Sequence, residues 1–246
     1  MENLNPRREW AASSQIRPSI VASPFEKGPQ QQAARELLTE QAQHTLAGIS
    51  ELIRLPARQV LYRQGDRADV VYNIITGAVL THELLVNGNR HITAFLFPND
   101  LLGLSAHGAY IATAETLSPI VAYKIPIDAL RETLTHDPAL SVGLVLKLCH
   151  DLRDAQHHAI TLAENSAHAR VAGFLLWLKS ALKSPQDPLC LPMARQDIAD
   201  YLGLSVESIS RALHLLESEA AILRVGPRLI RLLDPDKLAS YSGLDA

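Results

Sequence analysis

The sequence predicts an α+β protein in which an antiparallel β-domain comes first, one long helix follows, and a small helical domain with a two-stranded hairpin completes the fold. Three observations support this prediction. Short runs of Val, Ile, Leu, Tyr and Phe alternate with turn residues between Arg54 and Ile127, which is typical of a β-sandwich or barrel. An apolar stripe with helical spacing follows Asp137. Two more helical patterns joined by a glycine lie between residues 191 and 223.

Size and composition narrow the class of protein. The chain has 246 residues, 47% of them hydrophobic and 20% charged, which suits a globular protein with more than one core. Its two cysteines, Cys149 and Cys190, cannot build a disulfide framework, so we expect a reducing compartment. We see no secretory signal and no run of roughly 18 apolar residues, and we therefore expect a cytoplasmic protein without a membrane partner. The net charge of −3 does not by itself indicate a nucleic-acid partner.

The N-terminal part is predicted to contain an arm and a β-domain. Residues 1–30 carry four prolines and no apolar periodicity, which indicates a flexible arm. Apolar residues recur every three or four positions from Gln31 to Ile53, which predicts short amphipathic helices. Together with the strand region they form a predicted domain over residues 31–136. Asn87 and Gly88 are the strongest turn signal, because both residues tolerate the positive φ that a tight hairpin requires.

A long helix is predicted over residues 137–164. Asp137 is suited to cap it and Pro138 to occupy its first position. Its apolar residues step by three and four over more than two heptads, which makes a narrow seam suited to one partner helix. We therefore predict a homodimer, and the alternative is a helix packed only on its own domain. The predicted interface consists of Val145, Leu148, Leu152, Ala155, Ala159 and Leu162.

The last predicted domain, residues 165–246, contains a helix-turn-helix pattern. Such a pair needs a small residue where the helices cross, positive φ in the turn, and an apolar residue beneath the turn, and Ala199, Gly203 and Ile209 meet these needs. Ser205 is placed to cap the second helix. A helical hairpin that does not bind DNA is the alternative, and the exposed face of the second helix favours DNA binding.

That face carries side chains that read base edges. Arg211 offers two donors to guanine, and Glu207 accepts from cytosine N4. Ser210 is adaptable, and Val206 suits a thymine methyl group. Two short apolar runs then flank Gly226-Pro227-Arg228 and predict a hairpin beside the two helices, which makes this a winged helix-turn-helix. Phosphate contacts position a protein on DNA, and we assign them to Arg195, Ser205, Ser208, Arg224 and Arg228.

Over about residues 31–240 the sequence resembles the Crp/Fnr family of bacterial transcription regulators, and the stretch LPMARQDIADYLGLSVESISRAL resembles the FixK-type branch. The resemblance implies a β-roll of the cyclic-nucleotide-binding, jelly-roll type, a long dimerisation helix and a C-terminal winged helix-turn-helix. It also implies that a homodimer binds double-stranded DNA at a TTGAT/ATCAA-type palindrome, with Glu207, Ser210 and Arg211 as the reading residues. Activation through RNA polymerase, in low-oxygen or nitrogen-oxide related control, is the function it favours, with repression as the alternative.

The residues do not match the ligand-binding members of that family. Leu104 follows Gly103 where cyclic-nucleotide binders carry Glu, and no arginine lies between Arg90 and Arg131 to pair with a phosphate, so we do not expect cyclic AMP. No cysteine precedes Cys149, which excludes the family's [4Fe-4S] cluster. We therefore expect no cofactor and no metal.

Two alternatives for control stay open. Haem could be ligated by histidines, although their spacing specifies no such site; the candidates are His82, His91, His107, His157 and His158. Oxidation of Cys190, five residues before Arg195, could act close to the DNA-binding surface. We find no nucleophile, metal or nucleotide motif of an enzyme, and we predict that the protein is not one.

Overall fold

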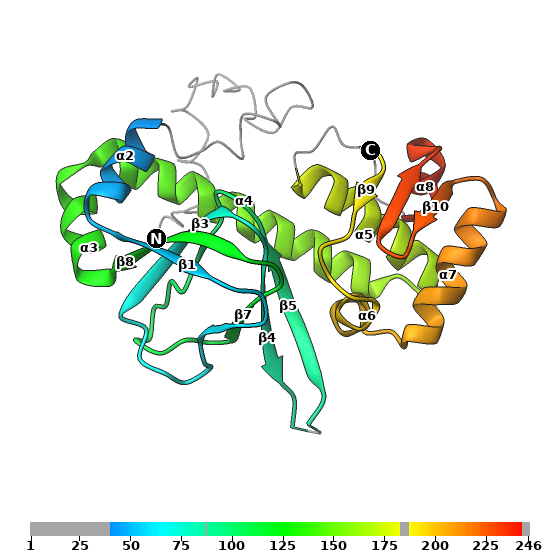
Figure 1. The fold of residues 1–246 in the computed structure, drawn as a ribbon, viewed down its shortest axis with the longest axis horizontal. Helices are drawn as coiled ribbons and strands as arrows, with labels where there is room; N and C mark the ends of the chain where they lie inside the picture. The colour runs from blue at the N-terminus through cyan, green and yellow to red at the C-terminus, as the bar shows by residue number, and fades with distance from the viewer. Residues whose placement is uncertain (1–39, 87, 183–186, 243–246) are drawn as a thin grey trace, which may run out of the picture.

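The computed structural model describes residues 40–86, 88–182 and 187–242, and it shows a β-domain and a helical domain on one long helix (Figure 1). The predicted arm, residues 1–30, lies outside the described residues. The predicted helical region is only partly confirmed, because helix α2 (Glu40–Gly48) is followed at once by strand β1 (Glu51–Leu55). In this strand Leu52 and Ile53 pair with β8, where cross-strand pairing overrides a short helical pattern.

The β-domain consists of two four-stranded antiparallel sheets, which confirms the predicted β-roll. One sheet has the order β1-β8-β3-β6, with β8 (Ile120–Pro126), β3 (Val70–Thr76) and β6 (Leu101–Leu102). The other has the order β2-β7-β4-β5, with β2 (Val60–Tyr62), β7 (Thr113–Thr116), β4 (Val79–Leu84) and β5 (Arg90–Leu96). Gly77 lies between β3 and β4 at φ +90°, and a Cβ there would collide with the Pro119 carbonyl. Only glycine therefore fits this turn.

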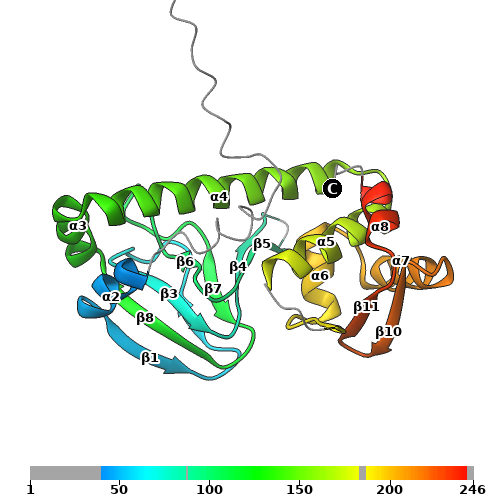
Figure 2. The ribbon, with the colours of Figure 1, turned by 90° about the horizontal axis from the view of Figure 1, so that it is seen from above.

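Helix α3 (Ile127–His136) leads into helix α4 (Pro138–Ala163), which has the predicted bounds to within one residue. The Asp137 carboxylate accepts a hydrogen bond from the Leu140 backbone N–H at 2.9 Å, and Pro138 occupies the first turn as predicted. Figure 2 shows that α4 runs along one side of the molecule and that both domains lie on its other side. Helix α4 is thus the common support of both domains.

The C-terminal domain is the predicted winged helix-turn-helix. Helix α5 (Ala167–Ala181) buries Val171, Phe174, Leu175 and Leu178 on one face. Helices α6 (Arg195–Leu202) and α7 (Val206–Ser218) follow, then the wing strands β10 (Ile222–Gly226) and β11 (Leu229–Leu232), and helix α8 (Pro235–Ser242). The short strand β9 (Leu189–Cys190), which the sequence did not predict, pairs with β11 and extends the wing to a three-stranded sheet.

One hydrophobic cluster spans both domains. Buried residues of the β4–β5 hairpin and the segment after it belong to the same cluster as the core of the C-terminal domain. The Phe95 ring lies 6.2 Å from the Phe174 ring and 4.9 Å from the Tyr201 ring, and the Phe97 ring lies 6.2 Å from that of Trp177. The β4–β5 hairpin is therefore the element of the β-domain that contacts the helix-turn-helix.

No helix within the described ranges is long and apolar enough to span a bilayer.

Candidate nucleic-acid interface

The turn between α6 and α7 has the geometry that the sequence predicts. Gly203 adopts φ +62°, and Ala199 and Ile209 are fully buried at the helix crossing and beneath the turn. The Ser205 hydroxyl accepts a hydrogen bond from the Ser208 backbone N–H at 3.1 Å, so the predicted cap of α7 is present. Arg170 of α5, which sequence reasoning missed, donates to the Leu202 carbonyl at 3.0 Å and stabilises the C-terminal end of α6.

Helix α7 presents three of its four predicted base-reading side chains to solvent. Glu207, Ser210 and Arg211 are exposed, whereas Val206 is half-buried and packs against the core beneath the helix. Hydrogen bonds from its own backbone N–H and from Ser205 lower the pKa of the Glu207 carboxyl, so the side chain is ionised and accepts hydrogen bonds only. Arg211 donates to the Ser208 hydroxyl at 3.3 Å and keeps the rest of its guanidinium in solvent.

In the wing, Arg224 has a protein partner that the sequence did not indicate. Its backbone N–H, Nε and Nη2 all donate to the Glu217 carboxylate, at 3.0, 2.7 and 2.5 Å, so Arg224 joins the end of α7 to β10, while its side chain stays partly exposed. Spacing alone could not show this pairing, because the partners lie seven positions apart across a turn. Arg228 is exposed at the tip of the wing, as predicted.

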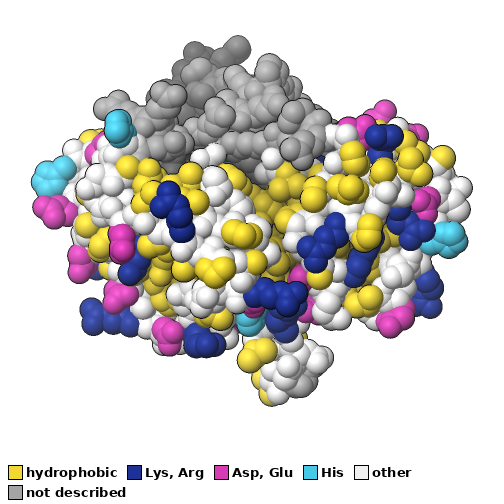
Figure 3. Space-filling model, in the orientation of Figure 1, with side chains coloured by type: hydrophobic (Ala, Val, Ile, Leu, Met, Phe, Trp, Pro, Cys, Tyr) yellow, Lys and Arg dark blue, Asp and Glu magenta, His cyan; other side chains and the backbone are white. Residues whose placement is uncertain are grey.

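Arg195 occupies the first position of α6, and one of its terminal nitrogens, Nη1, is buried without a hydrogen-bond partner in the described structure. Burial, and then the neighbouring charge of Arg224, lower the pKa of Arg195. Residues 166–246 hold nine Lys and Arg and nine Asp and Glu, so the placement of charge matters more than its sum. Figure 3 shows Lys and Arg side chains spread over the C-terminal domain on the face drawn.

The outward face of α4, which we define by its exposed apolar residues, contains most of the predicted dimer seam. Val145, Leu148 and Leu152 are 45–60% exposed, and Ala155 and Ala159 are also exposed. Leu162, the last residue of the predicted seam, is half-buried and lies beside Gly203, so its part in the seam stays a prediction. A strict heptad drifts by about 20° per seven residues around a straight helix, which turns its last position toward the C-terminal domain. The structure adds exposed residues that the heptad missed: Val142, Leu146 and Ile160.

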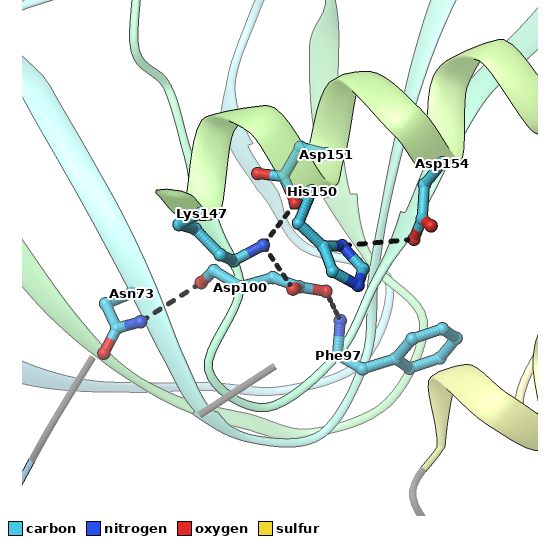
Figure 4. Close-up of polar contacts among 7 residues, drawn as sticks. All are labelled: Asn73, Phe97, Asp100, Lys147, His150, Asp151 and Asp154. Carbon is cyan, nitrogen blue, oxygen red and sulfur yellow. Dashed lines mark hydrogen bonds and ion pairs between the residues drawn. The ribbon is translucent and has the colours of Figure 1, made fainter. Parts of the chain in front are cut away.

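The inward face of α4 carries a buried lysine and several partly buried polar side chains (Figure 4). Lys147, 4% exposed, donates to the Asp100 carboxylate at 3.0 Å and also pairs with Asp151. Although burial opposes the charge of Lys147, these two carboxylates raise its pKa overall. The other carboxylate oxygen of Asp100 accepts from the Phe97 backbone N–H at 2.8 Å. This network joins α4 to the β-domain, and the sequence contained no signal for it.

A cavity of about 320 Å³ lies between the β-domain, the inward face of α4 and the C-terminal domain. Gly103 and Leu104 line it from the β-domain, Asp151 and Asp154 from α4, and Trp177 from α5. The Tyr62 and Tyr110 rings, which also line the cavity, stack with 3.8 Å between their centroids. Carboxylates and aromatic rings make this lining a poor match for a phosphate.

Two of the candidate haem ligands, His158 and His91, lie close enough for charge on one to affect the other, and Cys190 belongs to the C-terminal domain. His158 lines the cavity and stacks on Tyr201 with 3.8 Å between ring centroids, and its Nε2 is buried without a partner in the described structure. Burial, and then His91, lower the pKa of His158 to about 4. In the described ranges, no three His, Cys, Asp or Glu side chains converge as a metal site would require. Cys190 is exposed on β9, next to the wing.

A capped helix-turn-helix with polar side chains on its second helix and a wing beside it, joined to a β-domain through a long helix, defines a DNA-binding transcription regulator. Sequence comparison agrees, since residues 169–241 match the Crp-like helix-turn-helix domain and residues 52–137 match the cyclic nucleotide-binding domain. The chain belongs to the Crp/Fnr family of transcription regulators and is not an enzyme.

Individual relatives agree with this assignment. The chain is 34% identical to the nitrogen fixation regulation protein FixK of Rhizobium meliloti, over 75% of this chain and 83% of the relative. It is 32% identical to the transcriptional activator protein FnrA of Stutzerimonas stutzeri, over 75% of this chain and 78% of the relative. Among solved structures, FixK2 from Bradyrhizobium japonicum matches with a TM-score of 0.75 and 30% identity, over 80% of this chain and all of that structure.

Proposed function

We propose that the protein is a FixK-type activator that binds a TTGAT/ATCAA-type palindrome as a homodimer, in low-oxygen or nitrogen-oxide related gene control. The observation that carries this proposal is the exposed set Glu207, Ser210 and Arg211 on the first two turns of α7. The similarity of the chain to a FixK protein and to the activator FnrA supports three parts of the proposal: the FixK-type branch, activation as the direction of control, and a contact with RNA polymerase.

The chemistry of the exposed set suits a G·C pair within each half-site. Arg211 has donors for guanine O6 and N7, and the ionised Glu207 is an acceptor for N4 of the paired cytosine. Ser210 now donates to the Val206 carbonyl at 2.9 Å and can rotate toward DNA. Arg195 and Arg228 flank this face and suit phosphate contacts, together with the hydroxyls of Ser205 and Ser208. Arg224 supports the wing through Glu217.

The outward face of α4 supports the homodimer. Exposed apolar residues line this face along more than four turns of the helix: Val142, Val145, Leu148, Leu152 and Ile160. A strip of this length that faces solvent in one subunit is suited to cover by a second copy. A two-fold axis between the two α4 helices places two α7 helices on the same side of the dimer, as two half-sites of a palindrome require.

We further propose that neither a cyclic nucleotide nor an iron-sulfur cluster controls DNA binding. Activity then depends on the amount of the protein in the cell, which an upstream regulator sets. Leu104, the absence of arginine between Arg90 and Arg131, and the carboxylates in the cavity support the first part of this proposal. The absorbance spectrum of the purified protein tests for haem directly, because bound haem gives a Soret band. Such a band would contradict the proposal that the protein acts without a bound ligand.

Oxidation of Cys190 is a second candidate mode of control, favoured by the exposure of the residue beside the wing. If it operates, peroxide weakens operator binding in the wild type but not in Cys190→Ala. Equal sensitivity of both proteins would rule it out.

The proposed function is tested by a mobility shift at stated salt, with a TTGAT/ATCAA palindrome and a scrambled duplex of equal composition. We expect binding of the palindrome at least about a thousandfold tighter than of the scrambled duplex. Equal affinity for both duplexes would overturn the proposed reading of sequence, and a complex with one subunit per palindrome would overturn the dimer.

A further inference from the structure

Arg90, on strand β5 of the β-domain, forms an ion-pair fork with two acidic residues of α6. Its Nε donates to Asp200 at 2.9 Å, and its Nη2 donates to Asp197 at 2.6 Å. The two carboxylates are one helical turn apart, and the side chains of all three residues are no more than 29% exposed. A planar guanidinium held by two acceptors has one well-defined orientation.

Both carboxylates are themselves held in place by α6. The second oxygen of Asp197 accepts from the Ala194 backbone N–H at 2.8 Å, at the N-terminal end of the helix. The second oxygen of Asp200 accepts from the Gln196 side chain at 2.6 Å. The fork therefore joins the β4–β5 hairpin to the body of α6 and not to a mobile side chain.

The remaining contacts between this hairpin and the C-terminal domain are largely apolar. Phe95 packs on Tyr201 and Phe174, and these rings keep the two elements close. Apolar contacts are not directional, so they oppose separation more strongly than sliding or rotation. The Arg90 fork adds a directional contact at this interface.

We propose that Arg90 is a positioning residue that fixes the orientation of the helix-turn-helix relative to α4, and thereby sets the spacing between the two half-sites that the dimer accepts. Helix α7 packs on α6, so the angle at which α6 is held determines where the base-reading residues stand. In a dimer joined through α4, this angle decides the separation of the two α7 helices. The inference rests on the proposed binding of a palindrome by a homodimer.

The test measures binding to palindromes whose half-sites are separated by spacers of different lengths, changed in steps of one base pair. We expect the wild type to prefer one spacer. In Arg90→Met, we expect the affinity for the palindrome with that spacer to fall about tenfold, because the two helix-turn-helix units of the dimer are no longer held in one orientation. The differences in affinity between palindromes with different spacers should also become smaller. Affinity for a single half-site stays unchanged, since Arg90 touches no DNA.

A second route weakens the fork from the other partner. Asp200→Asn keeps the shape of the side chain and removes one charge, but it leaves the bond between Arg90 and Asp197, so we expect a partial loss of spacer preference. The double variant Arg90→Met/Asp200→Asn then loses no more than Arg90→Met alone, because Arg90→Met already removes both bonds of the fork. Arg54→Met, at an exposed arginine of β1, is the control for charge and should behave like the wild type.

The outcomes separate the inference from the function on which it rests. If the wild type binds no palindrome at any spacing, the proposed function is wrong. If the wild type shows a spacer preference and both Arg90→Met and Asp200→Asn retain it, the positioning role is wrong. A uniform loss of affinity by Arg90→Met on palindrome, half-site and random DNA would mean that Arg90 acts as a general cation, and would also overturn the proposal.

Discussion

Helices α4 and α7 distribute their side chains in opposite ways. Helix α7 buries apolar residues such as Ile209 and Leu213 and exposes Glu207 and Arg211, as a surface helix normally does. Helix α4 exposes residues such as Val145 and Leu152 and buries Lys147 among carboxylates. An apolar exposed face suits a second copy of the chain, and a polar exposed face suits DNA, so each helix indicates the chemistry of its partner.

The largest expected effect concerns the outward face of α4. Leu152→Asp places a carboxylate at the centre of the proposed interface in both subunits. We expect dimerisation to weaken by about 4 kcal/mol, because two buried leucines are lost and two charges are desolvated. Sedimentation equilibrium measures the change. Leu52→Asp, at an exposed leucine of β1, should leave the dimer intact; a dimer that tolerates Leu152→Asp equally well would contradict the difference between the two helices.

The second-largest expected effect concerns the inward face of α4. Lys147→Met leaves Asp100 and Asp151 without their buried cation, and we expect a loss of about 3 kcal/mol in the free energy of unfolding. Urea unfolding at a fixed protomer concentration measures it. Lys124→Met removes an exposed lysine that lies 3.9 Å from Glu51, and should cost no more than about 0.5 kcal/mol. Similar losses in both variants would mean that the buried network contributes little.

The exposed face of α7 is expected to contribute through individual base contacts. Arg211→Ala should weaken binding to the palindrome by about 1–3 kcal/mol per half-site and relax the preference for guanine. Arg228→Ala should instead weaken binding to all sequences alike and reduce the salt slope by about 1. Mobility shifts with single-base variants at two salt concentrations distinguish these effects. Equal losses on specific and random DNA in both variants would show that the two roles are wrongly assigned.

The smallest expected effect is a pH dependence at His158, where the inward face of α4 meets Tyr201. The folded-state pKa is about 4 against an ordinary value of 6.5, so the unfolded chain takes up the proton first. Its contribution to stability is therefore complete above pH 6.5 and declines as the pH falls toward 4. Between pH 7.5 and pH 5 we expect a loss of about 1 kcal/mol, reduced because solvent reaches part of the ring.

The variant His158→Phe keeps a ring on Tyr201 and removes this proton-binding group. It should lose less stability than the wild type over the same pH range in urea unfolding. Identical pH dependence in the two proteins would show that His158 titrates normally.

Local signals account for what the sequence predicted well. The Asp137-Pro138 start of α4, the Gly203 turn and the Ser205 cap all depend on neighbouring residues, and the structure confirms all three. The sequence predicts helix up to Ile53, but strand β1 begins before that residue. Its partner strand β8 lies about 70 residues further along the chain, so a local pattern could not show this pairing. The contacts of Arg224 with Glu217 and of Leu162 with the Gly203 turn form only after the helices have packed, so no local pattern could predict them.

By itself, the sequence determined the class of fold, the family, and three of the polar side chains that α7 exposes, because periodicity, caps and turns act within a few residues. The tertiary structure alone decided which face of α4 is left exposed, how the buried charge of Lys147 is neutralised, and that Arg90 holds α6. These contacts join residues 47 to 110 positions apart, and no local pattern encodes such a pair.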